Sequence, residues 1–178
     1  YFNLCQIFLN KSIVFCAQHY KLSSNDFTRE QEFNKNGATI SIAADRPNAA
    51  ACLLMIGSVF QLLSEVLYKR YREEKRFVLQ TRGAVASEVE DMKINSVQAA
   101  ERLSQHLIAR EMALYLDSKH LQAITDHYQL VALPNPSNVL TRHAYMINGM
   151  NSESAELAQA IRTEILQSKK KAAQLESE

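Results

Sequence analysis

The sequence predicts an all-α protein whose long helices form an antiparallel, coiled-coil-like hairpin around an irregular middle region. Only 4 glycines and 3 prolines occur in 178 residues, whereas an all-β fold needs many turns. Residues 53–67 and 158–175 both carry apolar side chains at alternating spacings of three and four, the pattern of a helix that packs along another helix. The length suits one domain with tails.

Residues 1–46 are predicted to be an N-terminal leader, extended or partly disordered. Residues 1–18 are apolar but interrupted by asparagine, glutamine and lysine, so they resemble neither a signal peptide nor a membrane span. The polar composition of residues 20–46 is typical of a disordered segment. The alternation in residues 38–42 suits a strand, but one strand cannot make a sheet.

The most informative segment is the apolar block Ala49–Leu63, which runs without a turn signal into a charged stretch. Asp45 and Pro47 are suited to the start of its helix. Its apolar residues cover most of the helix circumference, so this helix must be buried on several sides. An ordinary core helix, burial in an oligomer or filament, and insertion into a membrane all remain open, although the block is too short to span a bilayer.

The last helix offers only a narrow apolar seam, which is too small to cover the block fully. A partner is therefore expected to bury the remainder. The predicted self-assembly interface comprises Leu53, Ile56, Phe60, Leu63, Leu67, Ile161, Ile165 and Leu175.

The helical assembly domain is predicted to span residues 47–178. Gly83 is interpreted as a kink, the two prolines in residues 132–138 indicate a loop, and Asn148–Gly149 indicates a turn. Asn151 or Ser152 is suited to cap the last helix. The predicted helices are about 47–82, 84–116, 121–132 and 152–176.

No residue pattern indicates catalysis. The three cysteines show no metal or disulfide spacing and are read as small buried hydrophobic residues. Asp117 with His120, and Asp126 with His127, make a metal site conceivable, but the spacing is looser than that of a dependable ligand set. The basic run at residues 69–76 is interrupted by glutamates and is read as a solvated helix face. We therefore predict no enzyme, no catalytic residue, no metal, no cofactor and no small-molecule substrate.

The order of segments resembles that of a known family. The apolar helix ACLLMIGSVFQLL, the charged helix YKRYREEKRFVLQ, the segment EMALYLDSKHL and a C-terminal heptad helix follow one another. This layout is similar to that of the EspA and SseB type of type III secretion filament proteins. The resemblance implies a coiled-coil subunit that polymerises into a hollow extracellular tube.

The leading functional prediction is a self-assembling structural subunit of a secreted helical filament or translocation apparatus. One alternative is an intracellular helical adaptor or chaperone dimer in the cytoplasm, and another is a capsid-like or nucleic-acid-binding protein. A homo-oligomer or filament is the expected partner, with a secretion chaperone as a further candidate. A formal net charge of +1 disfavours nucleic acid. Membrane contact without spanning stays open.

Overall fold

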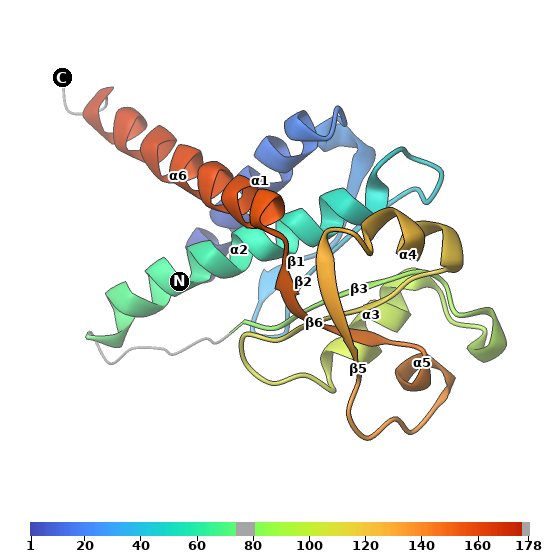
Figure 1. The fold of residues 1–178 in the computed structure, drawn as a ribbon. Helices are drawn as coiled ribbons and strands as arrows, with labels where there is room; N and C mark the ends of the chain where they lie inside the picture. The colour runs from blue at the N-terminus through green and yellow to red at the C-terminus, as the bar shows by residue number, and fades with distance from the viewer. Residues whose placement is uncertain (74–80, 176–178) are drawn as a thin grey trace.

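The computed structural model describes residues 1–73 and 81–175, with side chains to residue 172. Within these residues the fold is mixed α/β, with six helices, a two-stranded hairpin and a four-stranded sheet (Figure 1). The prediction of an all-α, coiled-coil protein is therefore wrong.

The elements alternate along the chain. In order they are α1 (Phe2–His19), β1 (Phe27–Asn34), β2 (Gly37–Ile42), α2 (Ala49–Arg72), β3 (Gly83–Ala86), α3 (Ser96–Ser104), β4 (Met112–Tyr115), α4 (Ser118–Ile124), β5 (Tyr128–Ala132), α5 (Val139–Arg142), β6 (Tyr145–Met150) and α6 (Ser152–Leu175).

Three helices and the hairpin form the first core. The antiparallel β1–β2 hairpin packs with α1, α2 and α6, and its inward side chains Ala38, Ile40 and Ile42 contact the buried residues of that cluster. The segment predicted to be an extended or partly disordered leader therefore forms α1 and the hairpin. The alternation in residues 38–42 does indicate a strand, and β1 supplies the partner that the sequence pattern did not reveal.

The four-stranded sheet has the order β3-β4-β6-β5. β3 and β4 are parallel and are joined through α3, whereas β6 is antiparallel to both β4 and β5. One face of the sheet, including Leu114, packs on α2 and α4. The other face, including Ala113, packs on α3 and α5.

Helix α2 is apolar around most of its circumference because it serves two cores. Leu54 belongs to the cluster between the sheet and α4, whereas Met55, Val59 and Leu63 belong to the cluster with α1 and α6. The prediction that this helix is buried on several sides is confirmed. The neighbours that bury it lie within the same chain.

The predicted helix 84–116 is the largest local error. The structure places β3, α3 and β4 there, and only Ser96–Ser104 is α-helical. Both faces of β3 and β4 are covered, so their apolar residues run on without the period-two alternation that marks a half-exposed strand. Likewise, β5 replaces the second half of the predicted helix 121–132.

The sequence predicted a cap for the last helix, a turn at residues 148–149 and a kink at Gly83, and the structure treats the three differently. Asn151 caps α6, since its side-chain oxygen accepts a hydrogen bond from the Ser154 N–H at 2.9 Å. Asn148–Gly149 is not a turn but lies inside β6, where Gly149 has a φ of +157° and Asn148 is an extra residue, since Gln129 and Leu130 pair with Gly149 and Ile147. Gly83 opens β3, while residues 74–80 of the predicted helix 47–82 lie outside the described residues.

The cysteines are expected to be inert in the native state. Cys5, Cys16 and Cys52 are free and fully buried, which confirms their interpretation as small hydrophobic residues. Burial raises the pKa of Cys52 to about 12 and also raises the pKa of the other two thiols. Because the thiolate is the reactive form, we expect iodoacetamide to modify the folded chain at least about a hundredfold more slowly than the urea-unfolded chain. Mass spectrometry of timed samples measures this, and equal rates would contradict the burial.

Candidate functional site

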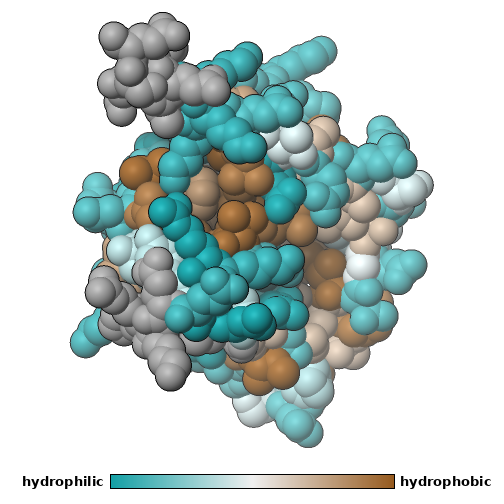
Figure 2. All heavy atoms as spheres, turned by 90° about the vertical axis from the view of Figure 1, so that its left-hand side faces the viewer, coloured by the Kyte–Doolittle hydropathy of each residue, from teal (hydrophilic) through white to brown (hydrophobic). Residues whose placement is uncertain are grey.

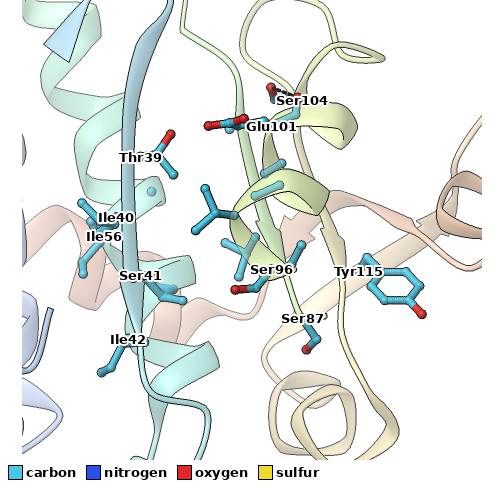
Figure 3. A pocket seen from close by; sticks show the side chains of 18 of the residues that line it. Thr39, Ile40, Ser41, Ile42, Ile56, Ser87, Ser96, Glu101, Ser104 and Tyr115 are labelled. Carbon is cyan, nitrogen blue, oxygen red and sulfur yellow. Dashed lines mark hydrogen bonds between the residues drawn. The ribbon is translucent and has the colours of Figure 1, made fainter. Parts of the chain in front are cut away.

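A groove of about 1460 Å³ separates the hairpin from the four-stranded sheet. β2 forms one wall, β3 and α3 form the other, and the first half of α2 forms the floor (Figure 3). This volume exceeds the ~300–1,000 Å³ typical of small-molecule pockets. The groove therefore suits a long occupant better than a compact one.

Small residues line much of the groove. Gly83, Ala84 and Ala86 lie on the β3 side, and Ala49 and Ala50 lie on the floor, where the Met112 side chain covers Gly57. Without large side chains in the way, an occupant's backbone can approach the strand wall closely.

The edge of β3 that faces away from β4 is unpaired in the described part of the chain. The backbone N–H groups of Gly83 and Ser87 donate to the carbonyls of Glu111 and Tyr115 beside β4, at 3.0 and 2.7 Å. Successive residues of a strand direct their N–H and C=O groups to opposite edges. The N–H and C=O groups of Ala84 and Ala86 therefore point to the free edge, into the groove.

Hydroxyl groups project into the groove from both walls. Figure 3 shows Thr39 and Ser41 on β2 opposite Ser96 and Glu101 on α3. Ile40 and Ile42 turn the other way, toward the first core. The walls thus offer polar side chains that can hydrogen-bond with a peptide backbone.

The groove is predominantly acidic beyond the end of β3. Glu88, Glu90, Asp91 and Glu101 line it and are exposed, and none of them forms an ion pair within the described residues. Lys35 and Arg82 lie elsewhere along its lining, and Arg82 donates to the Leu107 carbonyl at 3.0 Å. Basic groups of an occupant are therefore favoured near residues 88–91.

A hydrogen-bonded cluster joins the two walls. The ring of His120 approaches the Asp117 carboxylate through Nδ1 at 2.7 and 2.8 Å, and its Nε2 lies 2.9 Å from the Ala44 carbonyl on the connection between β2 and α2. The Asp117 N–H donates to Ser87 Oγ at 3.2 Å, just after β3. Desolvation alone raises the pKa of Asp117, but hydrogen bonds from the backbone and ring of His120 outweigh it, and the pKa is lowered.

This cluster does not have the geometry of a hydrolytic triad. A triad places histidine between serine and the acid, with one ring nitrogen on the serine. Here Ser87 contacts Asp117, and both ring nitrogens of His120 face other acceptors. The described residues also contain no group of three or more potential metal ligands, and the conceivable pair Asp126 with His127 does not gather further ligands.

The structure brings most of the predicted self-assembly residues together inside one chain. Ile56, Phe60, Leu63, Leu67, Ile161 and Ile165 all belong to the first core, and each is at most 9% exposed. Leu53 packs against this core while it also lines the groove, and the Leu175 side chain lies outside the described residues. These six side chains therefore pack within one chain, and Ile56 and Phe60 also line the groove.

Apolar side chains nevertheless gather on one face of the molecule. Figure 2 shows them in a hollow between polar side chains, on the side where the outer ends of α2 and α6 lie in Figure 1. On α1, Ile7 and Val14 are 45% and 36% exposed. Among the described residues, α2 alone is long and apolar enough to cross a membrane, and most of it is buried in the fold, as in the core helix of a globular protein.

Sequence reasoning missed the groove residues. The free edge at Ala84 and Ala86 gives no pattern of its own, because four small residues match either a helix or a strand. One available signal was Asn95-x-x-Gln98, whose two side chains and backbone N–H groups bond reciprocally at the start of α3. A helix that begins at residue 96 leaves residues 84–94 for other structure.

Comparison with known protein families and with curated proteins finds no match to this sequence.

Proposed function

We propose that this chain is a binding module that takes up an extended segment of a partner protein in the groove, as an additional strand beside β3. The observation that carries the proposal is the direction of the N–H and C=O groups of Ala84 and Ala86, which have no strand partner among the described residues and face into a groove. Main-chain hydrogen bonds give affinity in this mode of recognition, and neighbouring side chains give specificity.

The acidic residues of the groove favour a partner segment that is basic. The exposed carboxylates of residues 88–91 favour a segment with lysine or arginine where it passes the end of β3. Among the functions expected from sequence, an adaptor that binds partners without catalysis agrees best with this site. The secreted filament and capsid-like alternatives stay predictions.

Removal of one free-edge donor tests the proposal. Linear peptides of about ten residues, long enough to pair along a strand, are selected from a displayed library against the folded chain. We expect Ala86→Pro to weaken the selected peptides about tenfold, because proline removes the N–H that points into the groove and leaves the β3–β4 ladder intact. Isothermal titration calorimetry measures the change.

Gly83→Ala is the matched control on the same strand. Its N–H is already bonded to Glu111, and an added Cβ meets Met112 Cγ at 3.7 Å, an ordinary contact. If no peptide is selected, or if the selected peptides bind Ala86→Pro as tightly as wild type, the proposal is wrong.

A charge reversal tests the groove without altering the backbone. The double variant Glu88→Lys with Glu90→Lys is expected to weaken basic peptides about tenfold at low salt, with a smaller loss as salt rises. The double variant Glu32→Lys with Glu164→Lys makes the same change in net charge and serves as control, since both residues are exposed and do not line the groove. Equal losses in the two variants would show that net charge, and not the groove, attracts the peptide.

A further inference from the structure

The cluster around His120 requires a particular protonation state. Nδ1 faces the Asp117 carboxylate and Nε2 faces the Ala44 carbonyl, and both of these groups only accept hydrogen bonds. A neutral imidazole has a single N–H and can satisfy one of them. Only the imidazolium donates to both.

The two acceptors lie on opposite walls of the groove. Ala44 belongs to the connection that continues from β2, whereas Asp117 follows β4 and is bonded to Ser87 at the end of β3. The His120 side chain is 17% exposed, so it lies between these segments and not free in solvent.

We propose that His120 is a proton-dependent tie across this end of the groove: the imidazolium holds the Ala44 segment against the Ser87–Asp117 side, and loss of its proton releases that segment. Whether the tie controls peptide binding rests on the proposed function. The tie itself is a property of the free protein and does not depend on it.

The charged surroundings leave Asp117 as the ionic partner of His120. Arg46, on the same connection as Ala44, is paired with Asp26 at 3.3 Å. Lys119, Asp45 and Glu88 are nearby along the packed elements, and none of them forms an ion pair with His120 in the described structure. The half of α2 that packs here carries no charge before Glu65.

The tie has a limited pH window. The bond to one wall is lost once a rise in pH has converted the imidazolium to the neutral ring, which keeps a single N–H. The lowered pKa of Asp117 means that the contribution of the carboxylate is present above its unfolded pKa of about 4 and is lost as pH falls through the folded-state value. The tie is therefore closed while the ring is an imidazolium and the Asp117 carboxylate is ionised.

Nuclear magnetic resonance of the free chain tests the tie. We expect both ring nitrogens of His120 to be protonated while the tie is closed, because each of them faces an acceptor. The Arg46 and Ala49 amides are bonded to Ala43 and Arg46 carbonyls in the segment that is released. Their hydrogen exchange, corrected for intrinsic rate, should accelerate about five- to tenfold between about pH 6 and about pH 8.

Variants separate the tie from general pH effects. His120→Gln cannot titrate and should lose the step in exchange, and Asp117→Asn, which keeps an oxygen to cap α4, should move the step to lower pH. His106→Gln, at an exposed histidine outside the groove, should retain it. A neutral His120 ring at about pH 6, or a step that persists in His120→Gln, overturns the proposal.

A peptide arm distinguishes the two proposals. Peptides that run past Ser87 should bind more tightly at about pH 8 than at about pH 6, and peptides that end at Ala86 should not change. If amide exchange shows the step but no peptide binds, the tie is supported and the proposed function is wrong. If peptide affinity stays the same across the pH range in which amide exchange accelerates, the tie does not control binding in the groove.

Discussion

Leu63→Asp is expected to unfold the single chain. Leu63 on α2 is fully buried in the apolar core that α2 forms with α1 and α6, where a carboxylate loses its water. An unpaired buried charge belongs to the rare substitutions that destabilise by more than about 4–5 kcal/mol, close to the whole stability of a small domain. Circular dichroism should show loss of helix, and urea should produce little further transition.

This result discriminates between two roles for the same residue. If Leu63 packs between subunits, as predicted from sequence, Leu63→Asp gives a folded monomer. If it packs inside the chain, even Leu63→Ala should lower the free energy of unfolding by about 2–5 kcal/mol. Ile7→Ala on the exposed side of α1 is the control and should change it by less than about 0.5 kcal/mol. A Leu63→Asp variant with wild-type urea midpoint would contradict the burial.

Leu114→Ala is expected to produce the second large loss of stability. Leu114 lies on β4, between β3 and β6, and is fully buried against α2 and α4. Truncation there leaves a cavity where the sheet meets the helical core, so the free energy of unfolding should fall by about 2–5 kcal/mol.

Val131 on β5 offers the matched control, because it is also a strand residue but is 43% exposed. Val131→Ala should change the free energy of unfolding by less than about 1 kcal/mol. Urea unfolding followed by circular dichroism measures both variants. Similar losses in the two would mean that the sheet is not anchored to α2 through β4.

The sequence indicated the two long helices because their signals are local, although α2 ends at Arg72 and not near residue 82. In α6, the cap at Asn151 and the seam through Ile161 and Ile165 survive in the fold. In α2, the apolar circumference correctly indicated burial on several sides. The segments that cover α2 could not be predicted from its own sequence, because α1, the hairpin and the sheet come from other parts of the chain.

The strands were harder to predict for a physical reason. β3 and β4 are short and covered on both faces, so Val85 and Leu114 give the same continuous apolar pattern as a helix. These two strands are parallel and are connected through α3, so no hairpin turn in the sequence indicates that they pair. The free edge and the tie at His120 appear only after Ser87, Asp117 and Ala44 come together from three separate segments.

The recessed position of β3 has a consequence for colloidal behaviour. An unpaired strand on an open surface invites indiscriminate edge-to-edge aggregation, and proteins commonly shield such strands. Here the hairpin and α3 flank a strand of four residues, Gly83–Ala86, so a bulky folded sheet is sterically hindered where a slender chain can enter. We expect this shielding to limit edge-to-edge aggregation in concentrated solution and to admit only segments that are already unfolded.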